Sequence, residues 1–250
     1  MNDVTSGTAS LWWLGQGGFV FEGPLSGPLV VDPYLSNSVG DSGGPGRLFP
    51  VPVAPADLRV SAIILTHDHI DHTDPDSLIP LVAANPDAPI YAPPESVAHL
   101  ARLGITGDKV HPIGRDATYA LPGVTMHTTH AEHTPDSVGL VFEFEDGPTI
   151  YHTADTEYFD AIGGAKRFAP DLLSICINGR WGNMNIVDAV CATREIAPRL
   201  VLPMHWGLFA ENTADPDEFA RQLHASDSEA EPVLLPADGF ARYTIPRQGA

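Results

Sequence analysis

Apolar and polar positions in the first 35 residues alternate in a way that predicts short β-strands. Ser10–Leu14 and Phe19–Glu22 flank Gly15-Gln16-Gly17-Gly18, which we interpret as a hairpin turn. This glycine-rich segment lacks the spacing and the following helix of a nucleotide-binding loop. Leu29–Val31 is a third short apolar run, and a long loop rich in Gly, Ser and Pro is expected over residues 36–57.

Apolar runs then alternate with helical segments through the rest of the chain. Val60–Thr66 is the kind of apolar run expected of a strand buried on both faces, and Asp74-Pro75-Asp76-Ser77 carries helix-start signals. This succession predicts one α/β domain with two sheet halves over residues 1–250. The pattern predicts further strands at 89–92, 124–129, 138–144, 149–152, 172–177, 200–204 and 233–236, and helices at 78–84, 94–103, 186–196 and 215–223.

The composition is globular and strongly acidic. Thirteen Lys and Arg stand against 32 Asp and Glu, giving a net charge of −19. This charge argues against binding to nucleic acid, which needs cations to neutralise phosphates, and against docking on anionic membranes. We find no signal-peptide pattern and no apolar run long enough to span a bilayer, so a cytoplasmic protein is expected. Cys176 and Cys191 are expected to be free thiols.

The strongest chemical signal is Thr66-His67-Asp68-His69-Ile70-Asp71-His72, directly at the end of a predicted strand. Imidazole and carboxylate groups are ligands that suit Zn²⁺, Mn²⁺ or Fe²⁺. A loop leaving a strand can turn His67 and His69 to one side and Asp71 and His72 to another, so one short loop can serve two ions. A solvated polar loop is the alternative, but ionisable groups this crowded repel or compete unless a cation organises them.

Further ligands should lie where other strands end. His130 and His133 follow the strand predicted at 124–129, Asp155 follows the strand at 149–152, and His205 follows the strand at 200–204. Each of these residues offers an imidazole or carboxylate near the end of a predicted strand, as the first motif does.

The segment from Asn178 to Asn185 carries groups suited to an anionic substrate. Arg180 is one of the few cations and follows a buried strand, and a guanidinium binds phosphate or carboxylate bidentately. Asn178 and Asn185 are further candidates for substrate binding. A surface ion pair for Arg180, and turn or helix-cap roles for the two asparagines, are the alternatives.

Together these motifs resemble the metallo-β-lactamase superfamily, whose ligand pattern is HxHxDH followed by a His, an Asp and a late His. The resemblance covers nearly the whole chain and implies a four-layer αββα sandwich, with the metal site at one edge between the sheets. Five further motifs resemble the branch that contains L-ascorbate-6-phosphate lactonase: Trp12–Gly18, Asp32–Leu35, Ile177–Arg180, Met204–Phe209 and Asn212–Pro216.

The resemblance also implies a ligand set for two divalent metal ions, Mn²⁺ or Zn²⁺, with Fe²⁺ also accepted. Here His133 is preferred to His130, because it begins the loop before the strand at 138–144 as the third histidine does in related chains. Ala154 replaces a glycine that many relatives have before the aspartate, and its methyl group is tolerated if φ is negative. By position, one ion would take His67, His69 and His133, the other Asp71, His72 and His205, and Asp155 would bridge them.

Such a pair of ions implies hydrolysis by a hydroxide generated between them. Asp71, besides its ligand role, would orient that hydroxide or move its proton. The branch implies a small-molecule substrate, most simply a lactone of an anionic, sugar-acid-like compound, and often a homo-oligomer. A phosphodiesterase acting on a small cyclic phosphodiester, and a non-catalytic metal-binding protein, are the alternative hypotheses.

Overall fold

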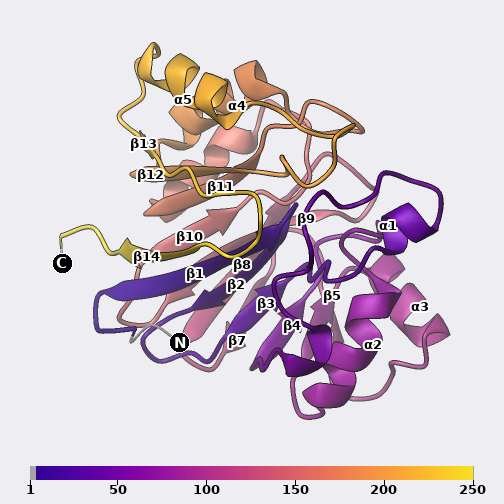
Figure 1. Cartoon of the computed structure of the whole chain (residues 1–250). Coiled ribbons are helices and arrows are strands. Elements are labelled where there is room, and N and C mark those ends of the chain that lie inside the picture. Colours follow the sequence, from indigo (N-terminus) through magenta and orange to yellow (C-terminus); the bar gives the residue numbers. More distant parts are fainter. Residues whose placement is uncertain (1–3, 250) are drawn as a thin grey trace.

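The computed structural model describes residues 4–249, and over this range the strands form two sheets of seven that pack face to face (Figure 1). The first sheet runs in the order β14 (Arg242–Pro246), β1 (Thr8–Gly15), β2 (Gly18–Glu22), β3 (Leu29–Val31), β4 (Ala62–Ile64), β5 (Ile90–Ala92), β6 (Val110–Pro112). The second runs in the order β13 (Glu231–Pro232), β12 (Leu200–Met204), β11 (Leu172–Cys176), β10 (Thr149–His152), β9 (Val138–Phe144), β8 (Val124–His130), β7 (Thr118–Leu121).

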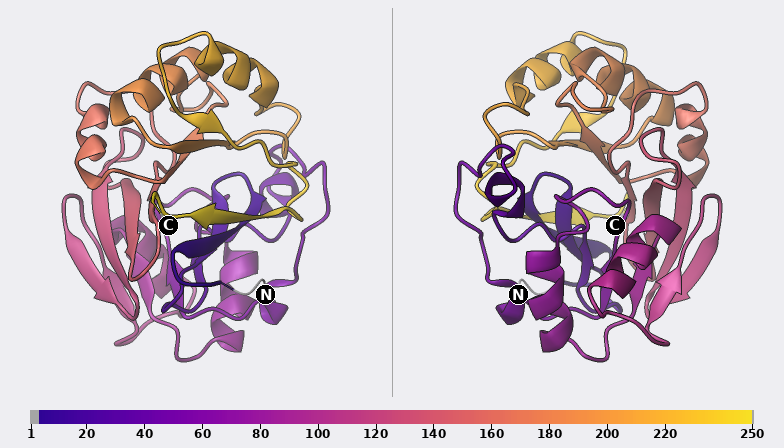
Figure 2. Two further views of the ribbon diagram at one scale, coloured as in Figure 1. Left: turned by 90° about the vertical axis from the view of Figure 1, so that its left-hand side faces the viewer. Right: turned by 90° about the vertical axis from the view of Figure 1, so that its right-hand side faces the viewer.

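Helices cover the outer face of each sheet, as Figures 1 and 2 show. Helices α2 (Pro75–Ala84) and α3 (Pro94–Arg102) pack on the first sheet, and α4 (Ile186–Ile196) and α5 (Pro216–His224) pack on the second. The predicted αββα sandwich is therefore confirmed. Three short helices lie in connections: α1 (Ser38–Asp41), η1 (Pro55–Asp57) and η2 (Ile162–Phe168).

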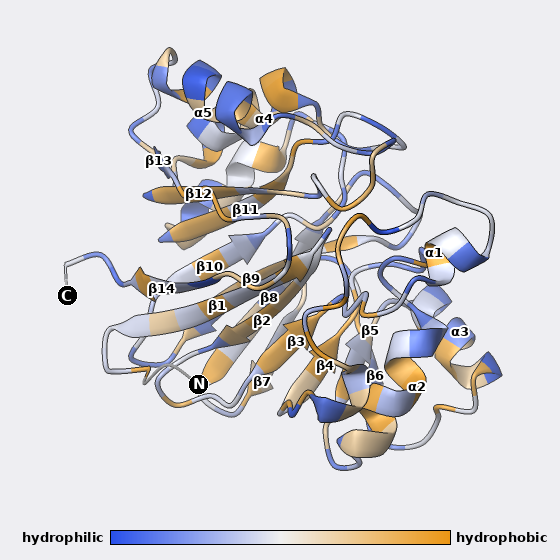
Figure 3. Ribbon diagram, in the orientation of Figure 1, coloured by the Kyte–Doolittle hydropathy of each residue, from blue (hydrophilic) through white to orange (hydrophobic). Residues whose placement is uncertain are grey.

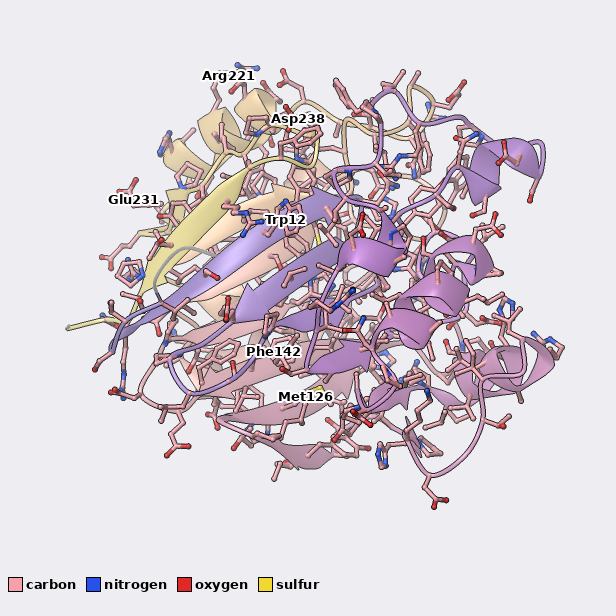
Figure 4. All side chains as sticks on the ribbon, turned by 60° about the horizontal axis from the view of Figure 1, so that its bottom comes forward. Trp12, Met126, Phe142, Arg221, Glu231 and Asp238 are labelled. Carbon is pink, nitrogen blue, oxygen red and sulfur yellow. The ribbon has the colours of Figure 1, made fainter. Side chains whose placement is uncertain are left out.

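The alternation of apolar residues along the strands builds two cores. In β3, Leu29 and Val31 face the second sheet, whereas Val30 faces the helices. The strands are accordingly apolar along most of their length, while the helices carry polar residues on their outer sides (Figure 3). Figure 4 labels Phe142 and Met126, which are fully buried on the second sheet in the core between the two sheets.

Two predicted strands differ from the structure for identifiable reasons. The strand predicted over Val60–Thr66 is limited to β4, because the Thr66 N–H turns away to donate to the Asp32 carboxylate. The strand predicted over Val233–Pro236 is wrong, and the pairing there is β13 instead. Its ladder with β12 ends at the Val233 N–H, close to two prolines that have no N–H to donate.

Helices within residues 4–249 include none that is both long and apolar enough to cross a membrane; α4 has 11 residues. Cys176 is buried and Cys191 half-buried, and both are free thiols, as predicted.

Candidate metal centre

The loop that follows β4 is held at both ends, which fixes the histidines it carries. The Asp32 carboxylate accepts the Thr66 N–H at 2.9 Å and the Thr66 hydroxyl at 2.6 Å. Further along, the Thr73 hydroxyl donates to the His67 carbonyl at 2.9 Å. Asp68 points away from the other acidic and imidazole groups of the loop and pairs with His99 of α3 at 2.7 Å.

Three histidines converge at one side of this loop, and we call them the three-histidine cluster. The Nδ1 atom of His69 lies 3.0 Å from Nε2 of His67 and 3.0 Å from Nε2 of His133. His133 reaches the cluster from the segment between β8 and β9, so the two sheets contribute to it together. This is the set that the family resemblance implies for one ion.

A second group, the aspartate–histidine cluster, consists of Asp71, His72 and His205, whose ligand atoms lie within 4.8 Å of one another. Nε2 of His205 is 3.6 Å from Asp71 Oδ2, and Nε2 of His72 is 3.9 Å from Asp71 Oδ1. His205 directly follows β12 and β12 belongs to the second sheet, so this cluster also joins the two sheets.

Asp155 lies between the two clusters, just after β10. Its Oδ2 atom is 3.1 Å from Nε2 of His205, 3.5 Å from Nε2 of His72 and 3.7 Å from Nε2 of His133. One carboxylate oxygen thus faces groups from both clusters.

The outer nitrogens of several cluster histidines have oxygen partners that fix the ring orientation. Nδ1 of His72 lies 2.7 Å from Asp32 Oδ2, and Nδ1 of His133 donates to the Gly182 carbonyl at 2.8 Å. Nδ1 of His67 is 3.0 Å from the Thr66 hydroxyl. Each of these contacts leaves Nε2 directed into its cluster, as metal-binding histidines require.

Electrostatics differ between the clusters. Burial lowers the pKa of His67 well below its usual value and lowers that of His69, and the neighbouring imidazoles add to the effect in both cases. Burial thus favours the neutral forms of His67 and His69, the protonation state that binds a cation.

Carboxylates reverse this pattern in the aspartate–histidine cluster. Burial alone would lower the pKa of His205 and of His72. The nearby carboxylates, Asp155 first among them, outweigh it and raise the pKa of His205 to about 9 and that of His72 well above its usual value. Burial acts to raise the pKa of Asp71, but His72 and His205 together bring it down to about 2. The cluster is thus a tightly paired set of opposite charges.

The residues present fit a pair of bound cations. Nε2 of His72 and Oδ1 of Asp155 are buried without a hydrogen-bond partner among the described residues. In the three-histidine cluster, three ring nitrogens face each other at hydrogen-bond distance although neutral imidazoles have few protons to share. Imidazole and carboxylate are ligands for Zn²⁺, Mn²⁺ and Fe²⁺ alike.

The other candidate residues lie outside the clusters. Nε2 of His130 pairs with Glu132 at 2.7 Å, so the structure brings His133 to the cluster and leaves His130 apart. Arg180 is exposed. Asn178 is buried and donates to Asn212 at 2.7 Å, which holds its loop in place.

Asn185 has a local structural contact. Its side-chain oxygen accepts the Asp188 N–H at 3.0 Å and caps helix α4. Cap chemistry was the alternative to substrate binding for this residue.

The backbone at Ala154 corrects one expectation. Its φ is +58°, in the left-handed region, rather than negative. The following residue is Asp155, so the left-handed turn directs the carboxylate between the two clusters. A glycine would adopt this conformation without strain, and Ala154 holds it at a cost of about 1–2 kcal/mol.

Two residues at the site were missed from sequence. Asp32 follows β3, and the rule that strand ends carry the polar groups would have found it. Gln16 lies at the tip of the β1–β2 hairpin, fully buried, with its side-chain nitrogen 3.3 Å from His205 Nδ1. The glycines around it explained the turn by themselves, and the Trp12–Gly18 motif that carries part of the resemblance assigned no role to its side chain.

The loop over residues 36–57 lies beside the metal centre. The Leu48 N–H donates to the Leu208 carbonyl, three residues after His205, and Arg47 donates to the Tyr34 carbonyl at 3.0 Å. The loop therefore contacts the segment that carries His205.

Comparison with known proteins agrees with this architecture. A metal-dependent hydrolase of Cupriavidus metallidurans is 31% identical over 93% of this chain and 84% of its own length. The Igni18 metallo hydrolase of Ignicoccus hospitalis superposes with a TM-score of 0.77, at 22% identity, over 95% of this chain and 98% of that chain. An isothiocyanate hydrolase from Delia radicum gut bacteria superposes with a TM-score of 0.71, at 21% identity, over 94% and 97%.

A family model described as the β-lactamase superfamily domain matches residues 29–206, the stretch that holds every candidate ligand from His67 to His205. The relative from C. metallidurans is described only as a metal-dependent hydrolase, a term that fits the two clusters without specifying a substrate. The chain belongs to the metallo-β-lactamase superfamily and is one of its metal-dependent hydrolases.

Proposed function

We propose that this protein is a two-metal hydrolase that opens a lactone of a small anionic substrate. The observation that carries the two-metal part is the position of Asp155, whose Oδ2 lies within 3.7 Å of ring nitrogens from both clusters. His67, His69 and His133 would hold one ion, Asp71, His72 and His205 the other, and Asp155 would contact both. Two divalent cations, when bound this way, lower the pKa of a shared water and polarise the substrate carbonyl.

Among the side chains of this protein, Asp71 is the one that would act on the attacking water. Asp71 stays ionised at neutral pH, since His72 and His205 hold its pKa at about 2. Its side chain is 17% exposed, more than that of Asp155 at 5%, so it is the carboxylate that incoming water meets first. Asp71 would therefore orient the attacking water by accepting a hydrogen bond from it.

Arg180 supports the anionic character of the substrate. It is exposed on the loop that also contains Gly182, whose carbonyl fixes His133. The arginine ion pairs of residues 4–249 do not include Arg180, so its guanidinium is open to a carboxylate or phosphate of a ligand. Asn178 and Asn185 would contribute by holding this loop and helix α4 in place.

The choice of a lactone rests on the sequence motifs that resemble the ascorbate-6-phosphate lactonase branch. A lactone needs a nucleophile at its carbonyl and stabilisation of the leaving alkoxide, and the paired clusters can provide both. A net charge of −19 disfavours polymeric phosphodiesters but leaves a small cyclic phosphodiester as the second candidate.

The test is turnover by protein loaded in turn with Mn²⁺, Zn²⁺ and Fe²⁺. Lactones with and without an anionic substituent are compared with bis(p-nitrophenyl) phosphate, with proton release or nitrophenolate as the readout. We expect opening of anionic lactones, and a higher KM for these alone in Arg180→Met. Robust phosphodiester turnover without lactone opening would favour the second candidate, and two bound ions without any turnover would favour a non-catalytic metal-binding protein.

A further inference from the structure

We propose that Trp181 is a substrate-binding residue, and that the substrate therefore carries an aromatic ring beside its acidic group. The inference rests on the hydrolase function proposed above and narrows its substrate class. It concerns a side chain that is neither a candidate metal ligand nor a charged group, on the loop between β11 and α4.

Trp181 lies at the tip of a tight turn, in a backbone conformation that is unusual for a bulky residue. The Asn183 N–H donates to the Arg180 carbonyl at 3.2 Å. The two residues between them, Trp181 and Gly182, have φ values of +52° and +82°. Positive φ at both central positions is the pattern of a type I′ turn, in which asparagine followed by glycine is preferred. A large aromatic residue in this conformation is an outlier, and such outliers gather at functional sites.

Three buried asparagines hold the turn in place. The Asn178 side-chain oxygen accepts the Asn183 side-chain N–H at 3.1 Å, and the Asn178 side-chain nitrogen donates to the Asn212 side-chain oxygen at 2.7 Å. These contacts join the loop to the segment that follows His205. Trp181 is therefore fixed through its backbone, whereas its side chain is exposed.

The turn adjoins the three-histidine cluster. The Gly182 carbonyl accepts the His133 Nδ1–H at 2.8 Å, and a Cβ atom at Gly182 would come within 2.9 Å of the same nitrogen. Nε2 of His133 lies 3.0 Å from Nδ1 of His69. His69 is exposed whereas His67 is buried, so the cluster is open to solvent at His69. Trp181 directly precedes Gly182 and therefore belongs to the rim of this opening.

Other segments at the metal centre also carry exposed apolar side chains. Trp181 is 62% exposed, and Ile70, which lies between two candidate ligands in the chain, is 38% exposed. Leu48 and Phe49 are exposed on the loop that contacts the segment carrying His205. Large apolar side chains that gather at one exposed place on a protein mark a binding site.

The neighbouring residues Arg180 and Trp181 together define the substrate class. A guanidinium binds a carboxylate or phosphate, and an indole ring stacks against another aromatic ring. Because the two residues are adjacent in one turn, the acidic group and the ring should be close together in the substrate. An aryl-substituted lactone that bears an acidic group meets both requirements.

The test uses two hydroxy acids, mandelate and lactate, which differ only in that mandelate has a phenyl group where lactate has a methyl group. Their dissociation constants for the Zn²⁺-loaded protein are measured by NMR titration. An aromatic contact contributes a factor of about 3 to 10 in affinity, so the wild type should bind mandelate more tightly than lactate by that factor. The indole N–H signal of Trp181, assigned as the signal lost in Trp181→Phe, should shift with mandelate much more than with lactate.

Three variants separate the ring from the turn. Trp181→Asn removes the ring and supplies the residue that the turn prefers, so it should keep the wild-type Zn²⁺ content and bind the two acids within about twofold of each other. Trp181→Phe should keep most of the preference for mandelate. The control is Leu25→Asn, which changes a side chain that is 59% exposed between β2 and β3, and it should match the wild type.

Equal binding of the two acids by the wild type, an indole signal that mandelate does not shift, or a Trp181→Asn variant that keeps the preference would overturn the proposal. Lactone turnover by the wild type distinguishes this failure from that of the proposed function. A wild type that prefers mandelate but opens no lactone would refute the lactonase activity alone. A wild type that opens anionic lactones without any preference for an aryl substituent would refute the role of Trp181 alone.

Discussion

The two clusters of the metal centre hold similar imidazoles in opposite electrostatic settings. In the three-histidine cluster, burial lowers the pKa values of His67 and His69. The aspartate–histidine cluster consists of paired charges, with the pKa of His205 raised to about 9. A cation at the first cluster would displace no proton from His67 or His69, whereas a cation at the second would displace the protons of His72 and His205, which neutralise the carboxylates.

Left-handed backbone occurs beside both clusters. Asp32 and His205 at the second cluster have φ values of +44° and +60°, Ala154 before the shared Asp155 has +58°, and Trp181 next to Gly182, whose carbonyl orients His133, has +52°. Among the candidate ligands in the two clusters and Asp155, His205 alone has a positive φ. Left-handed non-glycine residues of this kind gather at functional sites. In the proposed two-metal arrangement, one ion would bind among rings whose pKa values burial lowers, and the other in a set of paired charges.

The largest expected effect is loss of the contact between the clusters. Asp155→Ala removes the oxygen that faces His72, His133 and His205, so both ions should bind more weakly. We expect the loss of metal affinity to exceed the roughly 10- to 100-fold that follows removal of a residue hydrogen-bonded to a metal ligand, and we expect no measurable turnover. Elemental mass spectrometry of the purified variant measures the metal content.

Asp68→Ala is the matched control, because Asp68 lies within the same His/Asp motif but pairs with His99 outside both clusters. This variant should keep the wild-type metal content. An Asp155→Ala protein that retains two equivalents would show that Asp155 does not link the clusters.

A smaller effect is expected where an outer contact supports one cluster only. Asp32→Asn removes the charge beside His72 Nδ1 and weakens the acceptor for Thr66. The second ion should bind about 10- to 100-fold more weakly, with the first ion much less affected. Stepwise Zn²⁺ titration separates the two, and exposed Asp87→Asn is the control.

The pH dependence of binding should separate the clusters by at least about tenfold per pH unit. In the metal-free protein His205 is protonated below a pKa of about 9, the pKa of His72 is also well above its usual value, and the ligand form of both rings is neutral. Binding of the second ion therefore releases protons from both rings, and its affinity should rise with pH up to about 9. The pKa values of His67 and His69 are already below their usual range, so the first ion's affinity should be flat between about pH 7 and 9. If the affinities of both ions changed with pH in the same way, the proposed difference in protonation between the two clusters would be wrong.

The sequence predicted those parts of the molecule whose signals are local. Helix 186–196 and strand 138–144 have the predicted bounds, because each has a clear apolar period and well-marked ends. The candidate ligands follow strands that meet at one edge of the sandwich, so a strand-end rule gathered them without knowledge of the topology.

The same reasoning could not predict contacts between residues far apart in the sequence, or the sign of the φ angle at a given residue. Strand β14 (Arg242–Pro246) has Ile245 as its one fully buried residue and exists through pairing with β1 at the other end of the chain. Gln16 meets His205 across 189 positions. Ala154 has a positive φ where the chain turns after β10 to place Asp155 between the clusters. An alanine in the sequence does not predict a left-handed turn.

The smallest expected effect sharpens the question of strain. Ala154→Gly relieves the left-handed backbone but removes a fully buried methyl group and adds freedom to the unfolded chain. These terms offset, so the free energy of unfolding should change by less than about 1 kcal/mol, with both Zn²⁺ affinities unchanged.

Ala197→Gly is the matched comparison, because Ala197 has a φ of +52° at the exposed end of α4 and loses no buried methyl group. Denaturant unfolding should show Ala197→Gly to be the more stable variant. Weaker Zn²⁺ binding in Ala154→Gly alone would mean that the methyl group holds Asp155 in place, and that the left-handed backbone before Asp155 contributes to metal affinity.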